Sequence, residues 1–187
     1  MRNRFWGIVL TALALAFPVT TASAALVTYS TAGSFNGGSN SIVFGGGGNQ
    51  LTLTYTGVSS TVDANPLTFA SLGSFQTTVT GSGAAITPGT NFALNITQTA
   101  PTGGSGALLA TLTGTLSPNS STGVATFSVN SATIGGVTYS VVNNPVVLVP
   151  PSTNNGITSV QGLIAIPEPA GLSLLGAAGL LALRRRR

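Results

Sequence analysis

Apolar and hydroxyl-bearing side chains alternate in steps of two through the middle of this chain, and that period constrains its fold class most. The alternation is clearest in residues 51–56, 92–97, 108–113 and 125–129, where every second position is Leu, Ile, Val, Phe, Tyr or Ala and the positions between are mainly Thr, Ser or Asn. A period of two is that of a β-strand with one face buried, and no convincing 3.6-residue period accompanies it. We therefore expect residues 25–166 to be all-β.

Turn signals divide this body into about ten short strands at intervals of 8–15 residues. They include the glycine run 45–48, the Gly135-Gly136 pair and the sequence Asn154-Asn155-Gly156. Further strands are expected at Leu26–Thr31, Ser41–Phe44, Leu72–Thr80, Val137–Val142, Val146–Val149 and Ile157–Ile164. The spacing predicts an antiparallel β-sandwich. A β-helix is the alternative, but no fixed internal repeat supports it.

Charged residues are almost confined to the two ends of the chain. The sequence has six arginines and two acids among 187 residues, and between residues 25 and 166 only Asp63 is charged. Phosphate neutralisation requires Lys and Arg spread over a folded face, so this body is not expected to bind nucleic acid. The sequence also contains neither Cys nor His, which excludes a disulfide framework, a thiol nucleophile, an imidazole base and a His/Cys metal site.

The N-terminus reads as an export signal. A basic start with Arg2 and Arg4 precedes an apolar stretch over residues 5–19, and the small residues Ala22 and Ala24 follow in an A-x-A arrangement. This order is that of a secretory signal peptide, with cleavage expected after Ala24 by signal peptidase following Sec-type export. An uncleaved anchor helix is the alternative, although the apolar stretch is short for a membrane span.

The C-terminus has a second membrane-directed pattern. Pro167, Glu168 and Pro169 precede the uncharged apolar run 170–183, and Arg184, Arg185, Arg186 and Arg187 close the chain. As a helix this run is about 21 Å long, which is short against a hydrocarbon core of about 30 Å. Arginine side chains can extend to the headgroups, and the positive-inside rule keeps them in the cytoplasm. We expect a precursor tethered to the inner membrane with its body outside.

This tripartite end resembles the PEP-CTERM sorting signal. The Pro167-Glu168-Pro169 triplet matches the recognition triplet, and residues 170–187 match the membrane part. The resemblance implies a Gram-negative bacterium that makes an exopolysaccharide, and an exosortase that cleaves near the triplet and delivers the body to the surface. An ordinary C-terminal tail anchor is the alternative reading.

The body itself resembles the choice-of-anchor domains often found ahead of this signal. The resemblance rests on Phe92–Gln98, Pro101, Leu112–Thr115, Ile134–Tyr139 and Val160–Gly162. It implies a small exported β domain and transfers no functional residues.

Catalytic groups are scarce in the body. Carboxylate acid–base chemistry needs a pair, and Asp63 stands alone, so Asp63-Ala64-Asn65-Pro66 is interpreted as a turn whose Asp and Asn bond the local backbone. A calcium site at Asp63 and Asn65 would lack the several carboxylates such ions prefer. We expect no enzyme, no cofactor and no metal.

Sugar binding by ring stacking also has few candidate groups. The only Trp, Trp6, lies in the export signal, and the strand patterns place Tyr55 and Tyr139 in the core or in cross-strand pairs. The expected function is a structural protein of the cell surface or extracellular matrix, associated with exopolysaccharide. A non-catalytic carbohydrate-binding or adhesin-like module is the alternative.

Overall fold

The computed structural model describes residues 26–64 and 66–167, and this part is built of strands. It has fourteen strands and one short 3-10 helix. In chain order they are β1 (Leu26–Phe35), β2 (Ser41–Gly46), β3 (Asn49–Thr56), β4 (Ser59–Asp63), β5 (Leu67–Thr80), β6 (Ala84–Ala85), β7 (Thr90–Ala100), β8 (Gly104–Thr113), β9 (Thr115–Leu116), β10 (Val124–Val129), β11 (Ser131–Ile134), β12 (Val137–Val141), β13 (Val146–Val147), η1 (Asn154–Gly156) and β14 (Ile157–Ala165).

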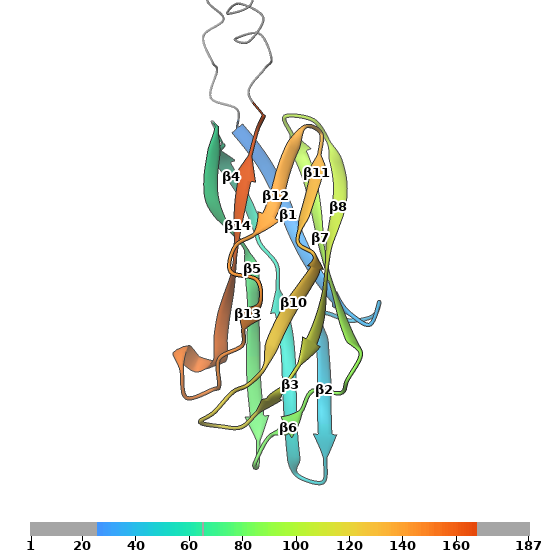
Figure 1. Ribbon diagram of the computed structural model, residues 1–187, viewed down its shortest axis with the longest axis vertical. Helices are drawn as coiled ribbons and strands as arrows, with labels where there is room; N and C mark the ends of the chain where they lie inside the picture. Colours follow the sequence, from blue (N-terminus) through green and yellow to red (C-terminus); the bar gives the residue numbers. More distant parts are fainter. Residues whose placement is uncertain (1–25, 65, 168–187) are drawn as a thin grey trace, which may run out of the picture.

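The strands form two six-stranded sheets that run along the length of the molecule (Figure 1). Sheet A has the order β13-β10-β8-β7-β1-β4, and sheet B has the order β11-β12-β14-β5-β3-β2. A small pair, β6-β9, stands apart from both. Every pairing in the two large sheets is antiparallel. The prediction of an all-β, antiparallel, sandwich-like body is confirmed at this level.

The clear alternations of the sequence became strands with the expected faces, except at Val129, which is 41% exposed because the pairing of β10 with β8 shifts register after Phe127. In β3, Leu51, Leu53 and Tyr55 are buried while the threonines between them are partly exposed. The glycine run also acts as expected, because Gly47 and Gly48 join β2 to β3 with φ values of 61° and 89°. Positive φ at both central residues is what the tightest hairpin turns require.

The number and length of the strands differ from the prediction. β4, β6 and β11 were not predicted, since each is short and buries few apolar side chains. β5 has 14 residues and begins at Leu67 rather than Leu72. Its pairing with β14 shifts at Gly73, where Leu72 is left without an opposite residue. Such a bulge exchanges the faces of the strand, so the single alternation expected for 72–80 does not continue upstream.

Five aromatic rings join the two sheets through the middle of the core. Phe92 of β7 lies at the centre, with ring centroids 4.8 Å from Phe75, 4.9 Å from Tyr55 and 5.2 Å from Phe35. Phe127 completes the cluster at 6.4 Å from Phe92. Phe75 and Tyr55 belong to sheet B, whereas the other three rings belong to sheet A. Tilted and edge-to-face pairs of this kind contribute about 0.5–1.5 kcal/mol each beyond the area they bury.

Gly33 makes room for this cluster. A Cβ atom at this position would overlap the rings of Tyr55 and Phe92, which are fixed from opposite sheets. The absence of a side chain at Gly33 of β1 is therefore a packing requirement of the aromatic core.

We predict that Gly33→Ala destabilises the body by about 1–3 kcal/mol, because the added methyl overpacks a full core. Urea unfolding of residues 25–167 measures the change. Gly46→Ala is the matched control, since nothing lies within 4 Å of a Cβ placed there. Its effect should stay within about 0.5 kcal/mol. Equal stability of the two variants would contradict this view of the core.

Candidate functional site

The residues predicted to carry sorting lie at or beyond the limits of the described residues. Pro167 is exposed and follows β14. Ala22, Ala24, Glu168, Pro169 and Arg184–Arg187 lie outside the described residues. The apolar run 170–183 lies outside them too, and within 26–64 and 66–167 no helix has the length and hydropathy to cross a membrane.

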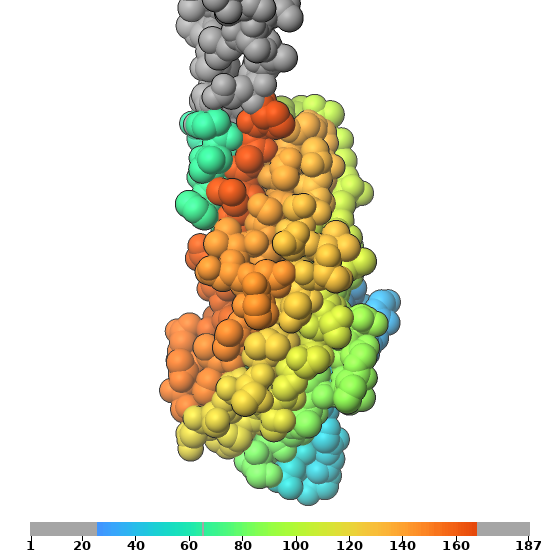
Figure 2. Space-filling model, viewed as in Figure 1, coloured from blue at the N-terminus to red at the C-terminus, as the bar shows by residue number. Residues whose placement is uncertain are grey.

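The two ends of the folded part leave the molecule side by side. β1 begins and β14 ends at the same end of the molecule (Figure 1), and Figure 2 shows β4, β12 and the last part of β14 on the surface of that end. Leu26 pairs with Asp63, while Ala165 pairs with Leu67. Both ends of the described body therefore flank the connection between β4 and β5.

The last core contact of the described residues comes directly before the Pro-Glu-Pro triplet, at Ile166. The Ile166 amide donates to the Pro66 carbonyl at 2.9 Å, and the Ile166 side chain packs partly buried against the core. Ala64, which is fully buried, fills this end of the molecule from the β4–β5 connection. Among the described residues, Ile166 is thus the last that packs on the core, and Pro167 is exposed to solvent.

Asp63, the one charged residue of the body, is exposed at the end of β4. The turn expected at residues 63–66 does lie between two strands, β4 and β5. Asn65 is outside the described residues, so the hydrogen bonds predicted within this turn, and the calcium alternative with it, remain predictions. Within the described ranges, no three His, Cys, Asp or Glu residues gather as a metal site would require.

All three tyrosines of the chain are buried in the core. Tyr29 and Tyr139 meet edge to face across the two sheets, with ring centroids 5.7 Å apart. The Tyr29 hydroxyl donates to the Ser71 carbonyl at 2.7 Å, and the Tyr55 hydroxyl donates to the Leu72 carbonyl. The prediction that Tyr55 and Tyr139 are core residues is confirmed, and none of the three rings offers a face on which a sugar could stack.

A buried amide partners the third tyrosine. The Tyr139 hydroxyl donates to Gln98 Oε1 at 2.7 Å, and Gln98 Nε2 donates to the Thr102 carbonyl at 2.7 Å. Gln98 is 1% exposed. Sequence reasoning missed this group, although the inward series Phe92, Leu94, Ile96 carries it as its next member. A polar residue at an inward strand position is the signal that would have found it.

Burial keeps these phenols protonated. Loss of solvation raises the pKa of Tyr139 to about 12, with a smaller contribution from the neighbouring Tyr29. Burial likewise raises the pKa values of Tyr29 and Tyr55, against smaller opposing hydrogen bonds from Ser60 and Thr31. The tyrosines therefore stay protonated in the folded protein and act as hydrogen-bonded packing groups of the core.

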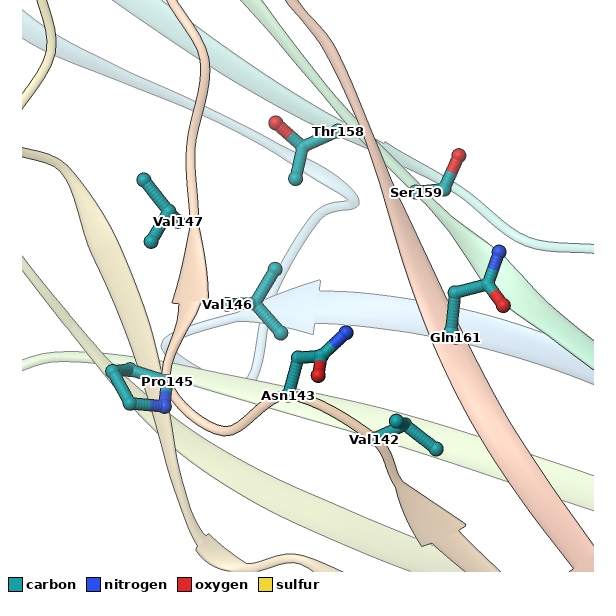
Figure 3. A pocket seen from close by; sticks show the side chains of 8 residues that line it. All are labelled: Val142, Asn143, Pro145, Val146, Val147, Thr158, Ser159 and Gln161. Carbon is teal, nitrogen blue, oxygen red and sulfur yellow. The ribbon is translucent and has the colours of Figure 1, made fainter.

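A pocket of about 250 Å³ lies between β14 and the segment that crosses from sheet B to sheet A (Figure 3). It is uncharged, and no motif in the sequence predicted it. Four apolar and four polar side chains line it: Val142, Pro145, Val146, Val147, Asn143, Thr158, Ser159 and Gln161. The Thr158 hydroxyl already accepts a hydrogen bond from the Val149 amide at 2.9 Å. The side-chain amides of Asn143 and Gln161 are the largest polar groups that line the pocket.

We predict that the tyrosines make stability fall with rising pH above about 10, the ordinary pKa of an unfolded tyrosine. Between that value and the raised pKa values of the folded state, the unfolded chain has lost phenol protons that the folded protein keeps. The free energy of unfolding therefore decreases over this interval. Urea unfolding at a series of pH values measures the decrease. Phenolate absorbance of the folded protein that rose with a midpoint near 10 would contradict the prediction.

Comparison of the chain with family models, with curated proteins and with solved structures found no match. A proposal about function therefore depends on the residues and on where the fold begins and ends.

Proposed function

We propose that this chain is an exported, non-enzymatic structural protein of the cell surface or extracellular matrix, associated with exopolysaccharide. Its two ends are sorting signals. Signal peptidase removes residues 1–24 after Sec-type export, and an exosortase cleaves near Pro167-Glu168-Pro169. The finished product is the β body with short remnants of both signals.

The extent of the described body carries this proposal. Its first strand, β1 (Leu26–Phe35), lies wholly after the expected cut at Ala24. At the other end, Ile166 is the last residue of the described part that packs on the core, directly before Pro167. Removal of both ends would therefore delete no strand and no core side chain of the described body. A proline-rich segment presented just outside a closed fold is also accessible to a protease-like enzyme.

The charge distribution supports the membrane step. The apolar run 170–183 is bounded by four arginines, and these favour a cytoplasmic position for the C-terminus. Export places the body on the other side of the same membrane. The precursor is then a tethered intermediate whose Pro-Glu-Pro triplet lies at the outward-facing surface of the inner membrane, where a membrane-embedded exosortase acts.

The surface chemistry of the body suits a hydrated polysaccharide. Apart from Asp63 the body is uncharged, and hydroxyl groups of Thr and Ser are frequent on its exposed strand faces. Such groups donate and accept hydrogen bonds without requiring an ionic partner. A wide, weakly binding surface of this kind fits a matrix component better than it fits a selective receptor.

Mass spectrometry of the native extracellular protein tests the proposal. We expect a product that starts at Ala25 and ends within or next to residues 167–169. Replacement of the Pro167-Glu168-Pro169 triplet by alanines should leave the apolar run and arginines attached. Pro88→Ala, at an exposed loop position, is the control and should be trimmed normally. An extracellular product with both ends intact would overturn the proposal.

A carbohydrate-binding module is the second candidate, and the pocket of Figure 3 is the observation that favours it. Its amides would bind a neutral sugar. Saturable binding of one sugar, abolished by Gln161→Ala but not by the exposed Gln50→Ala, would favour the module over a structural role.

A further inference from the structure

Four apolar side chains form a patch on the outer face of sheet B, and we name this set the exit patch: Leu67, Phe69, Leu163 and Ala165. The two strands that carry it are neighbours, with Leu163 opposite Phe69 and Ala165 opposite Leu67. Directly opposed residues of an antiparallel pair lie on the same face with Cβ atoms about 4.5–5.5 Å apart. Phe69 is 64% exposed and Leu67 is 52% exposed, so the patch is open to solvent.

The bulge at Gly73 places these side chains outside. On the C-terminal side of the bulge Phe75 points into the core. On its N-terminal side Leu72 does so, which leaves Phe69 and Leu67 on the outer face. On the other side of β14 the corresponding residues of β12 are Thr138 and Ser140, opposite Ala165 and Leu163. The exit patch is therefore an apolar area bordered by hydroxyl groups, and Phe69 is the most exposed large hydrophobic residue of the described body.

The exit patch lies at the end of the molecule from which the chain continues toward its apolar run. Ala165, a member of the patch, is two residues before Pro167. Residues 167–169 span at most about 11 Å when fully extended, and the apolar run starts at residue 170. Leu26, which is 57% exposed, lies at the same end on sheet A. A membrane into which the apolar run is inserted from residue 170 onward is therefore within reach of the patch.

We propose that the exit patch rests on the lipid bilayer in the tethered precursor, with Phe69 and Leu67 in the interfacial layer. This inference rests on the proposed function, because it requires residues 170–183 to be inserted in the membrane. The patch contains no charge, so its contact with lipid is driven by burial of apolar area and not by anionic headgroups. Docking of this face holds the Pro-Glu-Pro segment along the membrane surface.

Tryptophan fluorescence in the full-length precursor tests the contact. Trp6 is the sole natural Trp, so Trp6→Phe gives a silent background into which Phe69→Trp is introduced. Val43→Trp is the matched control, because Val43 is 55% exposed on β2, away from the exit end (Figure 1). Leu175→Trp reports on insertion of the apolar run itself. Each variant is reconstituted in neutral phosphatidylcholine vesicles with and without brominated acyl chains.

We expect bromine near the headgroups to lower the emission at position 69 about twofold, since interfacial apolar groups reach about 5–10 Å into the bilayer. Emission at position 43 should not change, and emission at position 175 should be quenched by deeper bromine. Quenching at 175 but not at 69 overturns the exit-patch contact and leaves the membrane step intact. A blue-shifted but unquenched Trp at 69 would mean that a second copy of the chain covers the patch. Absence of quenching at both 69 and 175 overturns the membrane step and this inference together.

Discussion

Packing of aromatic rings from both sheets around Phe92 is the interaction on which the rest of this structure depends. The body has no disulfide, and between residues 26 and 166 only Asp63 is charged, so burial of apolar side chains is its main source of stability. Phe92 meets Phe75 and Tyr55 from the opposite sheet within 5 Å. Gly33 and Gly73 both leave space that Tyr55 occupies. These contacts fix how the sheets lie over one another, and through them which residues reach each end.

That arrangement brings the two ends of the described body together at the β4–β5 connection. The core contacts of the described residues are made between Leu26 and Ile166. For the sorting by removable ends that we propose, this has a physical advantage, because cleavage outside these residues leaves those contacts intact. It also brings the exposed Leu67 and Phe69 to the face from which the chain leaves. The exit patch and the fold boundaries are thus two consequences of one topology.

Much of the fold could be predicted because inward and outward residues alternate plainly in β3 and β7. The prediction failed where the pairing changes register, as at Gly73 in β5. A bulge adds one residue and exchanges the inward and outward positions of the strand, and an alternation in the sequence does not indicate where this occurs. It also missed β4 and β6, which are short and pair with strands distant in the sequence, and β11, which pairs with β12 across the Gly135-Gly136 turn but has no clear apolar pattern. Of the candidate sorting residues, only Pro167 lies within the described structure. The others are recognised by linear order alone, whereas the pocket and the Gln98 network exist only when distant strands meet.

The central claim is that residues 26–166 form a unit whose stability is independent of both ends. Its most direct test is to compare the free energy of unfolding of the full chain with that of residues 25–167 in the same detergent. The account predicts equal values within the uncertainty of the denaturant extrapolation. A trimmed body that was markedly less stable, or that failed to unfold in one cooperative step, would show that the ends belong to the fold and would contradict the account.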